Sequence, residues 1–315
     1  MSPGYDLVVL SDCVLDAYYR IDRLPVKPEE AQESLEPHFY PGGACNVAIA
    51  ARKLGLKVAV VDKFGNDCFS RILTEALRKE GVDLKVSLDD MHSTAVSNNL
   101  IDKKGRHAFV GHGGAGLYIN ESELDEDLIV SSRAVFFDGY SLNEGYPVYG
   151  FIRKAVNLAK ASSKLVFFDP GPRRVKNIAE FIRHSDAVFF NKKELLMHMG
   201  MSFREAVNEL KKDSEKVYVV KNGDRGSMCI SKGKAIRIKP FKPKKVLHTI
   251  GAGDVYDATF ISFFLRGYPI ELACAYASLM ASLKLEREHA GQLPELNEFL
   301  RIAEGYGLKG LSQKL

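Results

Sequence analysis

The sequence predicts a doubly wound α/β fold, in which a mostly parallel sheet is flanked by helices and carries a small β-sheet lid. The first observation is that short apolar runs of strand length alternate with segments of helical periodicity along most of the 315 residues. The second is that two segments, at about 15–40 and 95–112, have strand-like patterns without helices between them. With 46% hydrophobic and 27% charged residues, the composition is that of a globular protein, and the length suits one large domain or two small ones. Because no interdomain linker is apparent, we expect a single domain spanning 1–315.

The alternation begins with an apolar run at 5–10, which is typical of a strand buried on both faces. A helix is expected at 44–54, where Val47, Ala48, Ala51 and Leu54 recur at helical spacing and Gly55 ends the segment. Further strands are expected at 57–61, 134–137, 164–168, 187–190 and 216–220, and further helices at 69–79, 148–160, 203–211, 254–266, 270–285 and 296–303. Strands joined by such crossover helices form a parallel sheet covered on both faces.

The segments at 15–40 and 95–112 interrupt this alternation. The second contains a Lys103-Lys104-Gly105 turn between two strand-like runs, as expected for a hairpin. Strands without crossover helices would form a small sheet that projects from the main one, where a lid over a binding site would lie.

Charge, hydropathy and cysteine content exclude several classes of protein. The 44 basic and 40 acidic side chains leave a net charge of +4, which is too small a bias to indicate a nucleic-acid or membrane partner. The N-terminal residues lack the pattern of a secretory signal, and apolar runs such as 258–265 are much shorter than the roughly 20 residues that cross a bilayer. The five cysteines are scattered and form no C-x-x-C pair, so we expect a cytoplasmic protein with reduced thiols.

The strongest functional signal is the sequence His-Thr-Ile-Gly-Ala-Gly-Asp at 248–254, between a β-like run at 245–247 and an amphipathic helix. The small residues Gly251, Ala252 and Gly253 let the backbone turn sharply, so that successive N–H groups face one point at the positive end of the helix. Such a turn is an anion hole, and Asp254 would place an ionised carboxylate base beside it. The alternative is that the glycines only make a turn and that Asp254 only caps the helix.

A second glycine-rich turn, Pro-Gly-Gly-Ala-Cys-Asn at 41–46, opens the helix at 44–54. Gly42 and Gly43 would let a ligand approach the backbone, and Asn46 offers hydroxyl groups both a donor and an acceptor. Asp16 follows the first strand, on the side where open α/β sheets bind ligands, and its carboxylate could hold two sugar hydroxyls. Taken by itself, this second turn is better explained as a simple helix start.

A competing motif lies at 111–116, where Gly-His-Gly-Gly-Ala-Gly matches the G-x-G-x-x-G pattern of dinucleotide sites, with Asp138 downstream as a candidate ribose ligand. This loop follows a hairpin strand instead of the first strand of a βαβ unit, and 117–119 continues it without a helix. A NAD-binding oxidoreductase is therefore the weaker hypothesis. The sequence contains no G-x-x-x-x-G-K-[ST], which argues against a P-loop nucleotidase.

Four motifs taken together resemble those of the ribokinase-like PfkB carbohydrate kinases, and the resemblance extends over about 5–299. In chain order they are Gly42-Gly43-x-x-Asn46, Asn191-x-x-Glu194, Lys221-x-Gly223-x-x-Gly226 and Thr249-x-Gly251-Ala252-Gly253-Asp254. The resemblance implies a ribokinase-like fold and the ATP-dependent phosphorylation of a primary hydroxyl on a sugar or polyol, with ATP and Mg²⁺ as cofactors. Such chemistry requires alignment and electrostatic stabilisation more than covalent participation of the protein.

The resemblance also implies a role for each motif. Asp254 would accept the hydroxyl proton, and the backbone amides of 251–254 would stabilise the transferred γ-phosphoryl group. Asn191 and Glu194 would position Mg²⁺, through water, and the phosphates. The nucleotide would be bound by Thr249, Lys221, Gly223 and Gly226, with the helix around Ala277 and Ser278 beside the adenine. The substrate would be bound by Asp16, Gly42, Gly43, Asn46 and Arg173.

Three positions depart from the family's pattern. His248 stands where the family usually has an aspartate that helps to hold an activating potassium ion, which puts dependence on a monovalent cation in doubt. Gly171 replaces a frequent asparagine, which leaves Arg173 as the candidate site residue of that segment, and Thr259 stands where a glycine often packs the helix. None of these changes affects Asp254 or the anion hole.

No single residue identifies the substrate, and a nucleoside kinase is the alternative within the family. An adenosine- or cytidine-like substrate would need an aromatic base pocket, for which the lid segments and nearby residues offer Tyr18, Phe39, Phe109 and Tyr118. The basic residues at 103–106 fit a solvated turn better than the cluster that a phosphorylated sugar needs. A sugar sensor that has lost catalysis is opposed by the intact motifs. The resemblance further implies a homodimer formed through the lid.

Overall fold

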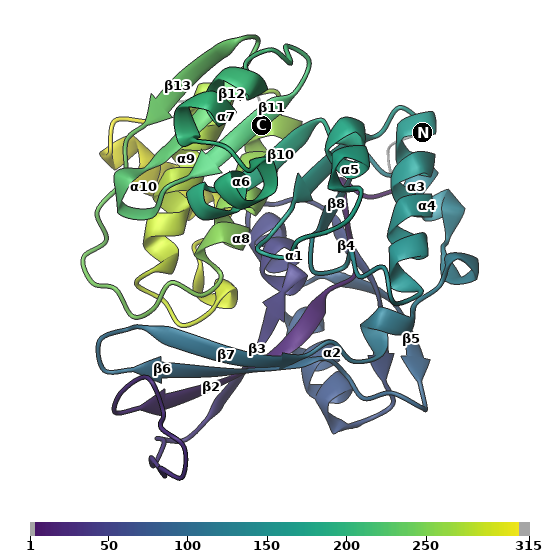
Figure 1. Ribbon diagram of the computed structural model, residues 1–315, viewed down its shortest axis with the longest axis vertical. Helices are drawn as coiled ribbons and strands as arrows, with labels where there is room; N and C mark the ends of the chain where they lie inside the picture. Colours follow the sequence, from purple (N-terminus) through teal and green to yellow (C-terminus); the bar gives the residue numbers. More distant parts are fainter. Residues whose placement is uncertain (1–3, 309–315) are drawn as a thin grey trace.

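The computed structural model describes residues 4–308, and its main body is a nine-stranded sheet in the order β13-β12-β11-β10-β9-β8-β1-β4-β5 (Figure 1). The strands from β11 to β5 in this order run parallel. At the other edge of the sheet, β12 is antiparallel to β11 and β13 is antiparallel to β12. The strands are β1 (Leu7–Leu10), β4 (Val58–Gly65), β5 (Asp83–Asp89), β8 (Ala134–Asp138), β9 (Leu165–Asp169), β10 (Ala187–Asn191), β11 (Val217–Lys221), β12 (Ser227–Ser231) and β13 (Lys234–Ile238). This sheet confirms the predicted doubly wound α/β class.

Helices cover both faces of the sheet, and each face has its own apolar core. On one side lie α1 (Ala44–Lys53), α2 (Cys68–Lys79), α8 (Ala252–Leu265), α9 (Ile270–Lys284) and α10 (Leu296–Gly305). On the other lie α3 (Glu126–Ser131), α4 (Val148–Ala161), α5 (Ile178–His184), α6 (Lys192–Met199) and α7 (Phe203–Leu210). Successive residues of β1 enter the two cores in turn: Leu7 and Val9 pack on the first side, and Val8 and Leu10 on the second. This alternation explains why the strand is a continuous apolar run.

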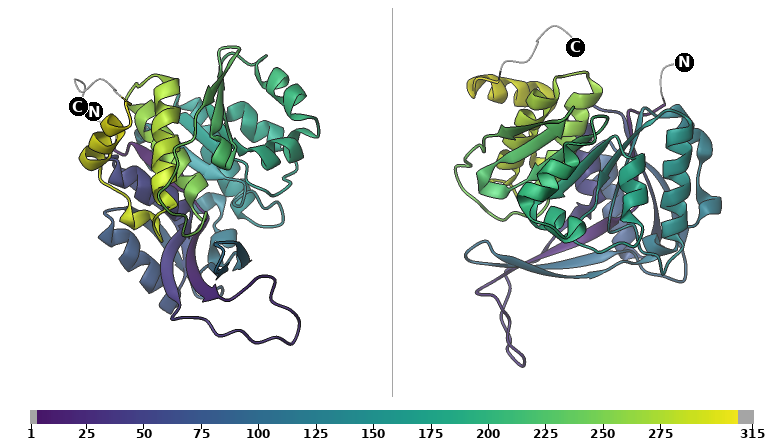
Figure 2. Two further views of the ribbon diagram at one scale, coloured as in Figure 1. Left: turned by 90° about the vertical axis from the view of Figure 1, so that its left-hand side faces the viewer. Right: turned by 45° about the horizontal axis from the view of Figure 1, so that its top comes forward.

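A second sheet of four strands projects from the main body in the order β3-β2-β6-β7 (Figures 1 and 2). Its strands are β2 (Cys13–Ile21), β3 (His38–Gly43), β6 (Val96–Asp102) and β7 (His107–His112). The strands begin and end differently from the predicted segments at 15–40 and 95–112, because 22–37 forms a long loop that extends from this sheet. The chain turns at 103–105, where the Gly105 amide donates to Asp102 O at 2.9 Å, as expected for the β6–β7 hairpin.

One local prediction is wrong. The β-like run at 245–247 is not a strand, because its neighbour is the end of α9 and not another strand: the Leu247 amide donates to Leu285 O at 2.8 Å. The segment therefore leads irregularly into α8. Among residues 4–308, none of the helices combines the length and hydrophobicity that crossing a bilayer requires.

Candidate active site

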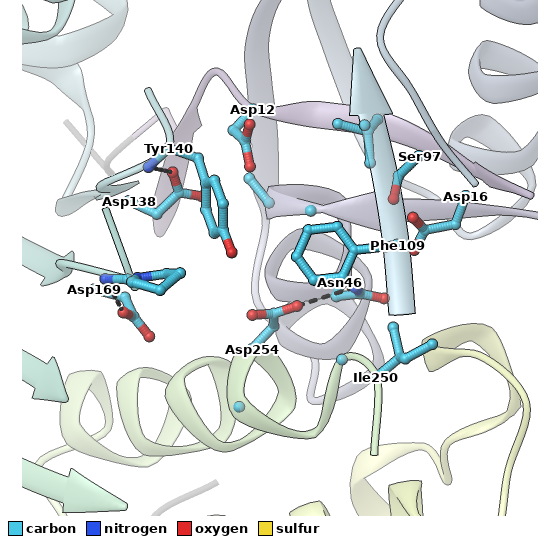
Figure 3. Close-up of a pocket in the computed structure, with 18 of the residues that line it drawn as sticks. Asp12, Asp16, Asn46, Ser97, Phe109, Asp138, Tyr140, Asp169, Ile250 and Asp254 are labelled. Carbon is cyan, nitrogen blue, oxygen red and sulfur yellow. Dashed lines mark hydrogen bonds between the residues drawn. The ribbon is translucent and has the colours of Figure 1, made fainter. Parts of the chain in front are cut away.

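A cavity of about 860 Å³ lies between the two sheets, at the carboxyl ends of the parallel strands (Figure 3). Each of several adjacent strands ends at, or just before, a polar residue that lines this cavity: Asp12 after β1, Asp138 in β8, Asp169 in β9, Asn191 in β10 and Lys221 in β11. Parallel strands bring their carboxyl ends to one edge of the sheet, so the topology itself gathers these side chains.

The turn at the start of α8 has the backbone conformation that the predicted anion hole requires. Gly251 precedes the helix with φ 76°, a left-handed conformation that favours glycine, and the Val255 amide donates to Gly251 O at 3.0 Å to begin the helix. The amides of Gly253 and Asp254 lie in the first turn, where helical amides lack an acceptor within the helix and face its positive end. Thr249 and these glycines line the cavity.

Asp254 lies beside these amides and is hydrogen-bonded to a side chain of α1. Asn46, in the first turn of α1, donates from Nδ2 to Asp254 Oδ2 at 3.0 Å (Figure 3). A Cβ on Gly251 would lie only 3.2 Å from that Asn46 nitrogen, so the glycine also leaves space for the amide. Burial raises the pKa of Asp254 to about 6 and the nearby Lys221 opposes the rise, so burial outweighs the stabilisation of the carboxylate that we expected at the start of the helix. A carboxylate with this pKa is ionised at neutral pH and suited to general-base catalysis.

Asp16 forms a second polar centre on the wall contributed by the small sheet. Asp16 is 4% exposed, and its carboxyl group accepts a hydrogen bond from Asn99 Nδ2 on β6 at 3.0 Å. Burial raises the pKa of Asp16 to about 7, while the bond from Asn99 opposes the rise. A Cβ on Gly42, in the adjacent strand β3, would lie 2.1 Å from Asp16 Oδ2. Gly42 is therefore required for the position of this carboxyl group.

A buried charge network lies directly beneath the anion hole. Lys221 Nζ is 2.8 Å from Asp169 Oδ2, and 2.9 and 2.8 Å from the two carboxylate oxygens of Asp257 on α8. Burial raises the pKa of Asp257 well above its usual value. Burial would raise the pKa of Asp169 as well, but Lys221 and the neighbouring hydrogen bonds hold that pKa below its usual value. The ammonium thus remains charged, and its nitrogen lies 3.4 Å from where a Cβ on Gly253 would be.

Asn191 and Glu194 are arranged by the start of α6. The Asn191 side chain accepts from the Glu194 amide at 2.9 Å, and Glu194 Oε2 accepts from the Asn191 amide at 2.6 Å. Burial raises the pKa of Glu194 to about 7, and the nearby Asp169 adds to the rise. Both side chains line the cavity and present oxygen donors, the type that Mg²⁺ prefers.

The other predicted site residues are distributed unevenly around the cavity. Gly43 and Arg173 line it, and Arg173 Nη1 is 3.3 Å from Tyr140 O. Ala252 lies in the first turn of α8. Gly223 and Gly226 form the turn between β11 and β12 and are not among the described residues that border the cavity.

The proposed neighbours of adenine, Ala277 and Ser278, are both buried in α9. Neither borders the cavity within the part of the chain that the structure describes.

Sequence reasoning missed several residues that the fold brings to the cavity. Asp12, at φ 60°, was passed over, and Asp138 was considered only as the acid of a dinucleotide site. Burial raises the pKa of Asp12 well above its usual value, and the nearby Asp138 adds to this rise. Burial also raises the pKa of Asp138 to about 8, and the nearby Asp169 and Asp254 add to that rise. Asn99 and Asp257 were also missed. Asp12 and Asp138 could have been found from the recurrence of a polar residue where each apolar strand ends.

The competing glycine motif at 111–116 has no dinucleotide-binding geometry. Gly111 lies in β7 of the small sheet, and the motif leads into a single short turn at 115–118 instead of a βα unit. Asp138 is engaged locally, accepting from the Tyr140 amide at 2.9 Å and the Ser141 amide at 3.2 Å.

Comparison with known proteins agrees with the motifs. A family model described as "pfkB family carbohydrate kinase" matches residues 5–296. Among curated proteins, the 5-dehydro-2-deoxygluconokinase of Bacillus subtilis (strain 168) is 30% identical over 292 residues, which cover 87% of this chain and 89% of that protein.

Solved structures show the same fold. The adenosine kinase from Sinorhizobium meliloti has a TM-score of 0.87 at 22% identity and covers 95% of this chain and 99% of its own. The ribokinase of Arabidopsis thaliana, in complex with ribose and ATP, has a TM-score of 0.82 at 24% identity, with 98% and 100% covered.

Proposed function

Because this chain belongs to the pfkB family of carbohydrate kinases and phosphorylates a sugar with ATP, we propose that its acceptor is a primary hydroxyl of a sugar acid, deprotonated by Asp254. The observation that carries this proposal is that a carboxylate base and an anion hole belong to one turn. Gly253 and Asp254 border the same cavity, and Asn46 beside them donates to the Asp254 carboxylate. A hydroxyl held at Asp254 would face a phosphoryl group held at the amides.

The geometry supports an electrostatic mechanism. The hydroxyl proton passes to Asp254 as the hydroxyl oxygen attacks the γ-phosphorus, and the bond to the β–γ bridging oxygen breaks to release ADP. Charge on the transferred group is stabilised by the α8 amides and by the Lys221 ammonium beneath them. Since Lys221 is fixed by Asp169 and Asp257, this positive charge needs no reorganisation during the reaction.

We propose that Glu194 and Asn191 hold Mg²⁺, through water, together with the phosphates. The donors fit this ion, since both offer oxygen atoms, and a cation would favour the ionised form of Glu194, whose pKa burial and then the nearby Asp169 raise. The ion would neutralise the charge of the phosphates during transfer.

The small sheet is proposed as a lid that excludes water from the reaction. It contributes Ser97, Asn99 and Phe109 to the cavity wall. Arg20 of β2 contacts both carboxylate oxygens of Glu288 at 2.6 Å, and Tyr40 of β3 stacks on His289 with ring centroids 4.1 Å apart. These contacts hold the lid against the segment that follows α9.

A sugar acid is favoured over a neutral sugar by the curated relative, which is named for 5-dehydro-2-deoxygluconate, and by Arg173. This exposed guanidinium borders the cavity and could pair with a carboxylate in bidentate geometry. The acids Asp12, Asp16 and Asp138, whose pKa values burial raises, suit hydroxyl groups better than a second negative charge.

An assay of ADP release with ATP and Mg²⁺ tests the proposal across 5-dehydro-2-deoxygluconate, other sugar acids, pentoses, hexoses, inositol, adenosine and cytidine. We expect the highest kcat/KM with a sugar acid. Highest turnover with a neutral sugar would contradict the assigned acceptor class, and silence with every compound would contradict the assigned activity.

A nucleoside kinase remains the second candidate because of Phe109. Of the four aromatic residues considered for a base pocket, Phe109 borders the cavity (Figure 3). Tyr18 instead packs edge-on against Tyr40 and His248, and Tyr118 stacks on His92. Highest turnover with adenosine or cytidine would favour this candidate.

Gly42→Ala is expected to raise KM for the sugar substrate about 10- to 100-fold with little change in KM for ATP, because the new Cβ would displace the Asp16 carboxyl group and its bond to the substrate. Steady-state kinetics in both substrates measures this. Gly305→Ala, at a glycine of α10 with open space around it, serves as control and should behave as wild type. An unchanged sugar KM in Gly42→Ala would remove Asp16 from the substrate site.

We also propose that the protein is cytoplasmic. A separate proposal is that two copies pair through the small sheet. The edge strand β7 is exposed along its length, with Phe109 56% and Val110 71% exposed, and such an edge offers unpaired backbone groups to a second copy. Sedimentation should then give twice the chain mass of 35.0 kDa. The monomer mass at micromolar concentration would contradict the pairing.

A further inference from the structure

Lys284, the last residue of α9, is a buried cation close to the active site. Lys284 is 1% exposed, and its Nζ donates to Arg287 O at 3.1 Å and to Glu288 O at 3.3 Å. Within residues 4–308 no carboxylate oxygen lies within 4.0 Å of this ammonium. A buried ammonium held only by carbonyl oxygens is costly, so its retention calls for a reason.

Its surroundings keep it charged. Burial lowers the pKa of Lys284 to about 8, and Glu288, Asp254 and Asp16 oppose this effect, so the group is still protonated at neutral pH. In return its charge lowers the pKa of both Asp254 and Asp16. The charged or titratable groups that interact with Lys284 are Asp16, Arg287, His248, Asp254, Glu288 and His289.

His248 shows that this region does not suit a free monovalent ion. His248 is fully buried. Burial lowers the pKa of its imidazole to about 4, and the nearby Lys284 and Arg20 add to that effect. Nε2 lies 3.4 Å from Glu288 Oε2, and Nδ1 has no hydrogen-bond partner in the described part of the chain. The Glu288 carboxylate beside this imidazole already binds Arg20 through both of its oxygens, and the Lys284 ammonium lies nearby, so the imidazole and its neighbours offer such an ion little attraction.

The two residues between Lys284 and its acceptor carbonyls bind the segment that precedes the turn at 248–254. The Leu247 amide donates to Leu285 O at 2.8 Å, and the Lys244 amide donates to Glu286 Oε1 at 2.6 Å. The segment that leads into Gly251 therefore contacts residues 285 and 286, and the ammonium contacts the next two residues, 287 and 288.

We propose that the Lys284 ammonium is a built-in cation, which holds the 285–288 turn and, through it, the anion-hole turn at 248–254, and so makes the enzyme independent of free monovalent cations. Lys284 is thus a positioning residue. The inference rests on the proposed role of Asp254 and the α8 amides, because they are what Lys284 positions.

The test compares wild type with Lys284→Met, which keeps the length of the side chain and removes its charge. Turnover is measured at constant ionic strength in chlorides of potassium, ammonium, sodium and tetramethylammonium. We expect wild-type kcat to be the same in all four. In sodium or tetramethylammonium, Lys284→Met should lose roughly 10²-fold in kcat with little change in either KM, because the anion hole is displaced, and ammonium should restore at least about tenfold.

Lys216→Met is the matched control. The Lys216 side chain is 14% exposed and pairs with Asp213, and it lies just before β11, away from the cavity. It should keep wild-type kcat in every salt. Lys284→Gln repeats the test if the methionine variant does not fold. Wild-type kcat in Lys284→Met without ammonium, a loss that ammonium does not relieve, or activation of wild type by potassium would each overturn the inference.

Thermal unfolding gives a second readout that is independent of activity. Ammonium should raise the Tm of Lys284→Met above its value in tetramethylammonium and leave that of wild type unchanged. A wild type without turnover would overturn the proposed function, and the Tm comparison would still decide whether Lys284 replaces a free cation.

Discussion

Asp254→Asn is expected to lower kcat by at least about 10²-fold while ATP affinity changes little, because the amide keeps the shape of the side chain and cannot accept the hydroxyl proton. The asparagine can still present its carbonyl oxygen to Asn46 Nδ2, now 3.0 Å from Asp254 Oδ2, so the cavity wall is preserved. Turnover is measured by ADP release, and ATP binding by calorimetry.

Asp127→Asn makes the same chemical change at an exposed residue in the first turn of α3 and should leave kcat unaltered. The pH profile of wild type adds an independent check. Since the base must be ionised and burial raises its pKa to about 6, kcat/KM should fall as the pH drops below that value. Near-normal turnover in Asp254→Asn would remove Asp254 from the role of base.

Lys221→Met is expected to cause the largest loss of stability, roughly 3–5 kcal/mol in the free energy of unfolding, or roughly 10 °C in Tm. The substitution leaves Asp169 and Asp257 buried without the ammonium that lies 2.8 Å from each. Because one carboxylate then lacks its countercharge, Lys221→Met combined with Asp169→Asn should recover part of the loss. Denaturant unfolding of the four members of this cycle measures the coupling.

The pH dependence of this loss has a definite sign. In wild type Lys221 helps to hold the pKa of Asp169 below its usual value, so the pair stabilises the fold above the unfolded pKa. In Lys221→Met, burial raises the carboxyl pKa in the folded state, so the folded protein binds more protons than the unfolded one and gains stability as the pH falls. The deficit should therefore be largest near neutral pH and shrink towards pH of about 5. A deficit that does not change with pH would contradict the uncompensated-charge explanation.

The arrangement of strands and helices could be predicted well because it depends on local patterns. The continuous apolar run at 5–10 indicated a strand buried on both faces, and β1 sends Leu7 and Val8 into different cores. The run at 245–247 had the same local character and is not a strand, because strand formation also requires a neighbouring strand, and here the neighbour is the end of α9.

The site was predictable to the extent that glycines and helix starts define it. The turn at 251–254 owes its sharp conformation before α8 to small residues, and glycine spacing reveals such a turn by itself. The position of Gly42 could not be explained from the sequence, because its reason is the Asp16 carboxyl group on the adjacent strand.

The sequence by itself therefore determined the parallel sheet, the small second sheet and the turn that carries Asp254. Only the tertiary structure decided which charges meet: Asn46 bonds Asp254 across 208 positions of the chain, and Lys221 joins Asp169 across 52. Hydrophobic periodicity and glycine conformation are properties of neighbouring residues, and one sequence displays them. Burial and charge pairing bring together segments that are distant in sequence, so the pKa of Asp254 and the role of Lys284 follow from the fold alone.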